Sequence, residues 1–216
     1  MPALAGGRAD AAQAMDRTLN GPRLLLRAPR PGDAEPAFDR WAQDPAVHRH
    51  LGWRPHHSLA QTHQQLDWDS ARWLKRSAFT WMLLPAGEPA PVGMVQLLPQ
   101  SQGGAPPHHL RLGYLLARPW QGKGLMREAV QRVLSHALAQ PEVWRVDALV
   151  DVDNAASLRL LLALGLVQEG RLGRHSLHPN VSGQPRDVWL LAALRGAWPA
   201  ASVQAVKSNS SGEDCR

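Results

Sequence analysis

Residues 109–139 read HLRLGYLLARPWQGKGLMREAVQRVLSHALA, and this stretch decides the fold of the chain. Residues 109–117 form an apolar run of strand length that leads into a loop carrying Gly122 and Gly124. Beyond the loop, apolar side chains recur at helical spacing as far as about Ala139. The stretch therefore predicts a strand, a glycine-rich turn and an amphipathic helix in direct succession.

The glycine-rich turn has the composition of a phosphate-binding loop. Glycine allows bare backbone to approach a phosphate, and the free N–H groups of the next helical turn then point at the anion. Lys123 adds a positive charge between the two glycines. A glycine pair is equally compatible with a tight structural turn. A dinucleotide fingerprint is excluded because Arg127 stands where its third glycine would be, and a P-loop is excluded by its longer Gly-Lys-Ser/Thr pattern.

A second polar element follows the next predicted strand, residues 145–152. Asn154 and Ser157 open a short helix over residues 155–164, so they fit an ordinary helix N-cap. They also stand at the end of a strand, as the glycine loop does. Two such ends side by side would hold a long cofactor between them.

The remaining pattern predicts one α/β domain built around a single sheet. Apolar runs and turn residues indicate further strands and helices on both sides of the glycine loop. The predicted strands are residues 24–27, 78–84, 92–98, 166–171 and 188–194, and the predicted helices are residues 34–43 and 58–76. Residues 22–198 are expected to form the folded domain, with 1–21 as a mobile N-terminal tail and 199–216 as a disordered C-terminal tail.

The overall composition argues against several classes of protein. The 216 residues carry a net charge of +6 and a pI near 10.6, but the arginines are scattered, so we expect no nucleic-acid partner. No apolar run is long enough for a membrane span or a secretory signal, which favours the cytoplasm and no membrane partner. Cys215 is the single cysteine, so no internal disulfide and no cysteine metal cluster are expected.

Taken together, these motifs resemble the GNAT acetyltransferases, and most of all those of the RimJ/RimL type that acetylate ribosomal proteins. The resemblance extends over about residues 24–194 and rests on linked pieces at the right spacing. These pieces are Leu112-Gly113-Tyr114, Trp120-Gln121-Gly122-Lys123-Gly124-Leu125-Met126, Glu128-Ala129, Asn154-x-x-Ser157 and Leu164-Gly165-Leu166. It implies a single-domain GNAT fold, with a mixed, mostly antiparallel central sheet flanked by helices.

The resemblance also implies a cosubstrate, acetyl-CoA, and the residues that hold it. The backbone groups of Leu115, Leu116 and Ala117 would contact the pantetheine arm. Asn154 and Ser157 would meet the far end of the cofactor. The pyrophosphate would be held by Gln121, Gly122, Lys123, Gly124, Leu125 and Met126.

The catalytic positions depart from the family pattern. Many members have a Glu where Arg111 stands and a Tyr acid where Leu161 stands. Strand alternation assigns Tyr114, the single tyrosine, to the core. Ser157 is a candidate to pass a proton to the CoA thiolate, and His109 is a candidate to take one from the amine through water. A helix-start role for Ser157 and a surface position for His109 remain the alternatives.

Five histidines lie close together in the sequence, in and after the segment that follows the first helix. None stands at the spacing of a recognised zinc motif, so we expect no metal site. Together with Trp53, they lie where the resemblance places part of the acceptor site, and they are expected to shape substrate choice. They are His48, His50, His56, His57 and His63.

The sequence therefore predicts an acetyl-CoA-dependent N-acetyltransferase that acts by direct attack of a primary amine. A protein or peptide N-terminal α-amine is the expected acceptor, because its free pKa of about 7.7 to 8.0, against roughly 10.4 for lysine, demands little of a general base. The alternatives are a small-molecule amine, such as an antibiotic or a polyamine, and a non-catalytic acyl-CoA-binding module. A monomer and a homodimer are equally compatible with the sequence.

Overall fold

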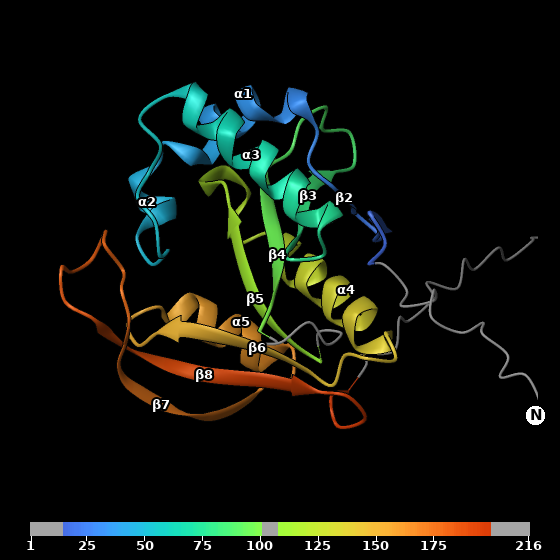
Figure 1. Ribbon diagram of the computed structural model, residues 1–216, viewed down its shortest axis with the longest axis vertical. Coiled ribbons are helices and arrows are strands. Elements are labelled where there is room, and N and C mark those ends of the chain that lie inside the picture. The colour runs from blue at the N-terminus through green and yellow to red at the C-terminus, as the bar shows by residue number, and fades with distance from the viewer. Residues whose placement is uncertain (1–14, 101–107, 200–216) are drawn as a thin grey trace, which may run out of the picture.

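The computed structural model describes residues 15–100 and 108–199 and contains one central sheet (Figure 1). Its strand order is β1-β2-β3-β4-β5-β6-β8-β7, and neighbouring strands run antiparallel except for β5 and β6, which are parallel. The strands are β1 Thr18–Asn20, β2 Leu24–Arg27, β3 Phe79–Pro85, β4 Gly93–Pro99, β5 His109–Leu116, β6 Arg145–Asp151, β7 Val167–Ser176 and β8 Arg186–Leu194. This is the mixed, mostly antiparallel α/β sheet that the sequence predicts.

Helices cover both faces of the sheet. Leu83 and Val95 pack in one apolar cluster with α4, whereas Met82 and Met94 pack in another with α1 and α3. This division follows from strand alternation, which turns consecutive side chains to opposite faces. The helices are α1 Ala34–Ala37, α2 Pro45–His48, α3 Leu59–Leu74, α4 Leu125–Ala139 and α5 Ala155–Ala163, and α1 continues as a π-helical turn, Phe38–Ala42. Ser58 caps α3 by accepting a hydrogen bond from the Gln61 N–H, as its sequence position suggests.

The two parallel strands separate along their length. β5 and β6 pair only at His109↔Arg145, Leu110↔Val146 and Arg111↔Asp147. Beyond Arg111, β5 stays paired with β4 as far as Leu116, and β6 stays paired with β8 as far as Asp151. The sheet therefore opens between the carboxyl ends of β5 and β6, and Figure 1 shows the two strands diverging.

One boundary of the predicted domain is wrong. Residues 18–20 form β1, which pairs with β2, and Met15 and Leu19 are only 5% and 3% exposed, so this part of the predicted N-terminal tail belongs to the core. Three residues carry too short a pattern to be seen as a strand in isolation, and the pairing with β2 supplies the missing stabilisation. Residues 1–14 and 200–216, which make up most of the two predicted tails, lie outside the described residues.

Candidate active site

A cavity of about 440 Å³ lies where β5 and β6 diverge. Its walls come from the end of β5, the glycine loop, the first turns of α4 and α5, and the segment around α2. It is lined by Ala46, Val47, His50, Leu51, Tyr114, Leu115, Leu116, Trp120, Gln121, Gly122, Gly124, Leu125, Met126, Arg127, Asn154, Ala156, Ser157 and Leu160. Nine of the residues predicted to bind the cofactor are in this lining, and Ala117 and Lys123 are not.

The glycine loop has the backbone that an anion site requires. Gly122 and Gly124 have φ angles of +74° and +75°, in the left-handed region that favours glycine. Gly124 is the N-cap of α4 and supplies no side chain to cap it, so the first N–H groups of this 15-residue helix are free of a side-chain partner. Free N–H groups at the positive end of a helix dipole suit a phosphate group.

Arg23, the residue just before β2, braces the glycine loop, a role that the sequence pattern did not indicate. Its backbone N–H and its Nε each donate to the Glu128 carboxylate at 2.8 Å, and its Nη1 donates to the Lys123 carbonyl oxygen at 3.1 Å. Lys123 itself is not among the lining residues, and its Nζ lies 4.9 Å from the centre of the Trp120 ring. The cationic side chain that does line the cavity is that of Arg127.

The backbone groups available on β5 differ from those expected. The Ala117 N–H donates to the Val92 carbonyl oxygen at 2.8 Å, and alternation along an antiparallel ladder then turns the N–H and C=O groups of Leu115 toward β4 as well. Tyr114 and Leu116 are the residues whose backbone groups face the gap. The Leu116 carbonyl oxygen accepts a hydrogen bond from Gln121 Nε2 at 2.8 Å, which leaves its N–H as the donor for a ligand.

Tyr114 corrects the expectation that its ring is simply part of the core. The ring packs against the core, but the hydroxyl lies 2.6 Å from Ser157 Oγ and the side chain lines the cavity. Burial raises the pKa of Tyr114 to about 12, and the hydrogen bond with Ser157 only partly offsets this. Asn154 caps α5 by accepting a hydrogen bond from the Ser157 N–H at 3.1 Å. Both residues also line the cavity, so the two interpretations of this pair are compatible.

The structure places His109 away from the cavity. His109 begins β5, seven residues before Leu116, and at about 3.3 Å per residue the two lie more than 20 Å apart. Its Nε2 is 2.8 Å from Asp147 Oδ2, and the other oxygen of that buried carboxylate accepts from Arg111 Nε at 2.9 Å. His109 therefore belongs to an ion-pair cluster at the opposite end of the strand, and we drop it as a candidate base.

A second cavity, of about 280 Å³, adjoins the first and shares Leu115 with it. Its walls include three tryptophans and two histidines, and burial lowers the pKa values of these histidines, His48 and His56. It is lined by Ala37, Trp41, Ala42, His48, Trp53, His56, Thr62, Gln65, Leu66, Trp68, Arg72, Met94, Gln96 and Leu115. Within residues 15–100 and 108–199, no group of three or more His, Cys, Asp or Glu side chains is arranged to hold a metal ion.

Comparison with known sequences identifies the family. Over residues 23–167 the chain matches the family described as the acetyltransferase (GNAT) domain. The chain belongs to the GNAT acetyltransferase family. It is an acetyl-CoA-dependent N-acetyltransferase, which confirms the enzyme class predicted from the motifs. Across the described part of the chain, no helix combines the length and the apolar character that a membrane crossing requires.

Three relatives illustrate how this GNAT enzyme compares with other proteins. It is 26% identical over 180 residues to the uncharacterised N-acetyltransferase p20 of Bacillus licheniformis, covering 82% of this chain and 96% of that protein. It is 31% identical over 122 residues to the ribosomal protein uS5-alanine N-acetyltransferase of Escherichia coli, covering 56% and 60% of the two chains. The fold matches the structure of Mycobacterium smegmatis RimJ in complex with CoA-disulfide with a TM-score of 0.72 and 22% identity, covering 84% and 88%.

Proposed function

We propose that this enzyme acetylates the N-terminal α-amine of a protein or peptide. The observation that carries the proposal is the character of the second cavity, which would receive the first residues of such an acceptor. Among the described residues that line it, none is Asp or Glu, whereas Arg72 is present and its guanidinium lies 4.4 Å from the centre of the Trp68 ring. The likeness to the uS5-alanine N-acetyltransferase supports the same class of acceptor.

The absence of Asp and Glu from the described lining of this cavity disfavours polycationic small molecules as acceptors. Polyamines and aminoglycosides carry several positive charges, and binding them in a partly buried cavity requires carboxylates to offset the loss of hydration. The indoles of Trp41, Trp53 and Trp68 instead offer apolar surface, and the lowered pKa values of His48 and His56 favour uncharged imidazoles at neutral pH. A peptide with one terminal amine suits this lining better than a polycation does.

In this proposal the first cavity holds acetyl-CoA along the opened edge of β5. The free N–H groups at the start of α4, after Gly124, bind the pyrophosphate, and Arg127 adds a positive charge beside them. The Tyr114 and Leu116 backbone groups that face the gap bind the amides of the pantetheine arm. Asn154 and Ser157 stand across the cavity on α5. This arrangement directs the thioester into the space between the diverging strands.

Acetyl transfer then proceeds by direct attack. The amine nitrogen forms a bond to the thioester carbonyl carbon and releases one N–H proton to a base or to water, the C–S bond breaks, and the CoA thiolate leaves. A thiol has a free pKa of about 8.5, so full proton transfer from a tyrosine whose pKa is about 12 would be uphill. We therefore assign Tyr114 and Ser157 to hydrogen-bond donation toward the thiolate as its charge develops, with the final proton supplied by water.

An acceptor panel tests the proposal. The enzyme with acetyl-CoA is offered peptides that begin with Ala, Ser or Met, the same peptides with blocked N-termini and a free lysine, spermidine, and an aminoglycoside. CoA release gives the rates, and mass spectrometry locates the acetyl group. We expect acetylation of the free α-amine at neutral pH and little reaction with the blocked peptides. Faster turnover of spermidine or the aminoglycoside would overturn the proposed acceptor class and leave the acetyltransferase activity standing.

A further inference from the structure

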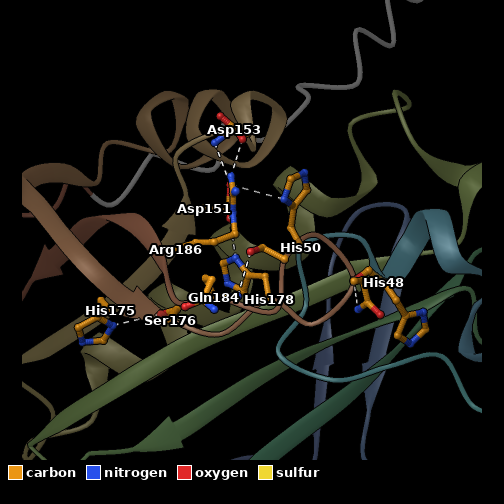
Figure 2. A network of polar contacts seen from close by, with 11 residues as sticks. His48, His50, Asp151, Asp153, His175, Ser176, His178, Gln184 and Arg186 are labelled. Atoms are coloured by element: carbon orange, nitrogen blue, oxygen red, sulfur yellow. Dashed lines mark hydrogen bonds and ion pairs between the residues drawn. The ribbon is translucent and has the colours of Figure 1, made fainter.

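Asp151 is a buried carboxylate at the carboxyl end of β6, next to the first cavity (Figure 2). Its Oδ2 accepts hydrogen bonds from Arg186 Nε at 2.5 Å and from His178 Nδ1 at 2.6 Å. Burial opposes ionisation, but the hydrogen bonds from Arg186, the Asp153 N–H and His178 outweigh it and hold the pKa of Asp151 well below its usual range. Asp151 is therefore a permanent negative charge at this edge of the cavity.

His50 faces this carboxylate from the segment just after α2. Its Nδ1 lies 3.7 Å from Asp151 Oδ1, and this nitrogen is buried without a hydrogen-bond partner among the described residues. Figure 2 marks this contact between the His50 imidazole and Asp151 with a dashed line. The distance exceeds that of a hydrogen bond, so the contact is an electrostatic one that favours a proton on Nδ1. With the proton on Nδ1, the lone pair of Nε2 is left for the cavity that His50 lines.

We propose that His50 is the general base that takes the proton from the acceptor amine, and that Asp151 is the positioning residue that sets its tautomer. This inference rests on the proposed function and names a residue of the same site. As the amine nitrogen bonds to the acetyl carbon, its N–H proton passes to Nε2 of His50. The C–S electron pair departs with the CoA sulfur, and His50 then returns its proton to solvent.

The position of His50 between the two cavities suits this role. Its side chain lines the first cavity, whereas the nearby His48 and Trp53 line the second. An acceptor held in the second cavity must bring its amine past this segment to reach the thioester. Tyr114 and Ser157 contribute to other walls of the first cavity, so proton removal and thiolate stabilisation are assigned to separate groups.

The charged groups around His50 favour the neutral base. Burial lowers the pKa of His50, and the positive charges of Arg49 and Arg186, with His178, act in the same direction. Asp151 opposes them, which stabilises the imidazolium once the proton has arrived. The net effect lowers the pKa of His50 from its ordinary value, which favours the unprotonated imidazole at neutral pH.

Replacing His50 with Gln tests the role through the pH profile. The probe is an alanine-initiated peptide with acetyl-CoA, assayed by CoA release from pH 5 to 8.5. Both the amine and His50 must be unprotonated, so log kcat/KM should rise with a slope of about two below the His50 pKa and about one between it and the amine pKa of about 8, where the profile levels off. In His50→Gln the slope should be about one everywhere below the amine pKa, with a loss on the order of 10²-fold at pH 7.

Two further variants separate catalysis from structure. In Asp151→Asn the break in slope should move to lower pH, because the carboxylate no longer raises the pKa of His50. His63, exposed on α3 and outside both cavities, gives the matched control, and His63→Gln should keep the wild-type profile. Acetyl-CoA affinity and melting temperature should be unchanged in His50→Gln. An unchanged slope in a folded, cofactor-binding His50→Gln enzyme would overturn the proposal.

A spectroscopic measurement tests the proposed tautomer of His50 without requiring turnover. Nitrogen NMR of the histidines, in the complex with acetyl-CoA at pH 7, should show His50 neutral with its proton on Nδ1. The preference for that tautomer should weaken in Asp151→Asn. A protonated His50, or a neutral one with its proton on Nε2, excludes it as the base. If no amine in the panel reacts, the proposed function fails, and this spectrum still tests the inference.

Discussion

Tyr114 shows how much of the environment of a single residue can be predicted from strand alternation. Alternation along β5 assigns a side chain to one face of the sheet, and the ring does pack against the core. The pattern does not reveal that β6 has already separated from β5 at this point and that a cavity opens beside Tyr114. The hydroxyl therefore reaches Ser157 in the cavity instead of being buried without a partner. Such an outcome depends on a strand that begins 31 residues further along the chain.

Replacing Tyr114 with Phe should lower kcat by about 10- to 100-fold, because a hydrogen bond to a charged group contributes about 1.5 to 3 kcal/mol. The ring stays in place, so acetyl-CoA affinity should change little. Steady-state kinetics and calorimetry measure the two quantities. If the pair acts as one unit, Tyr114→Phe combined with Ser157→Ala should be little worse than Ser157→Ala alone. Strictly additive losses would show that Tyr114 does not act through Ser157.

His109 illustrates the opposite error at the same scale. A histidine at the start of the strand that leads into the site is near the motif in sequence, but an eight-residue strand separates the two ends in space. His50, in contrast, lies 64 residues before Tyr114 in the chain, and its segment lines the same cavity. The histidines around it could be assigned to the acceptor region from the resemblance, but which imidazole meets a carboxylate is set by tertiary packing.

At the scale of elements, local pattern is sufficient where the element is long and periodic. The 15-residue α4 and the glycine loop before it follow directly from spacing and backbone freedom, and the structure has both. The three-residue β1 and the four-residue α2 were missed. α2 is defined by Pro45 after the N-cap Asp44, a pattern that equally ends the preceding helix. Elements of this length are stabilised by what they pack against, which the local sequence does not show.

Gly124 gives the test of the loop that precedes α4. In Gly124→Val, a β-branched side chain must adopt a φ near +75° beside the free N–H groups, so acetyl-CoA affinity should fall by about 10-fold or more, which corresponds to about 1.4 kcal/mol or above. Isothermal titration calorimetry measures the affinity. Gly87, with φ +82° in the turn between β3 and β4, is the matched control for backbone strain. Equal affinities in Gly124→Val and Gly87→Val would show that the loop does not hold the cofactor.

At the scale of the whole molecule, the candidate active site is a consequence of incomplete sheet pairing. β5 and β6 are parallel neighbours for three residue pairs only, and each then stays with its other partner. The cavity exists because the sheet parts at this point, and the glycine loop and α5 close its ends. Strand patterns predict which segments are extended and that they share a sheet. The point at which two strands separate depends on the packing of all the layers, so the sequence could indicate the contents of the site but not its shape.

The N-terminal segment from Met15 to Asn20 is part of the folded domain. Met15 and Leu19 are buried in the main core, the Asp16 carbonyl oxygen accepts from Trp81 Nε1 at 3.0 Å, and β1 covers the edge of β2. Burial of two such side chains contributes about 1.5 to 3 kcal/mol each, which is a large share of the 5 to 15 kcal/mol typical of a domain.

A chain that begins at Pro22 should therefore melt about 10 °C or more below the full chain, and its apparent acetyl-CoA affinity should fall because Arg23, which braces the glycine loop, would stand next to a new terminus. Differential scanning calorimetry and a cofactor titration measure the two effects. A chain that begins at Met15 keeps every contact described for this segment and is the matched control. If the chain from Pro22 melted and bound acetyl-CoA as the chain from Met15 does, β1 would contribute nothing to the fold, and the domain would begin at residue 22 after all.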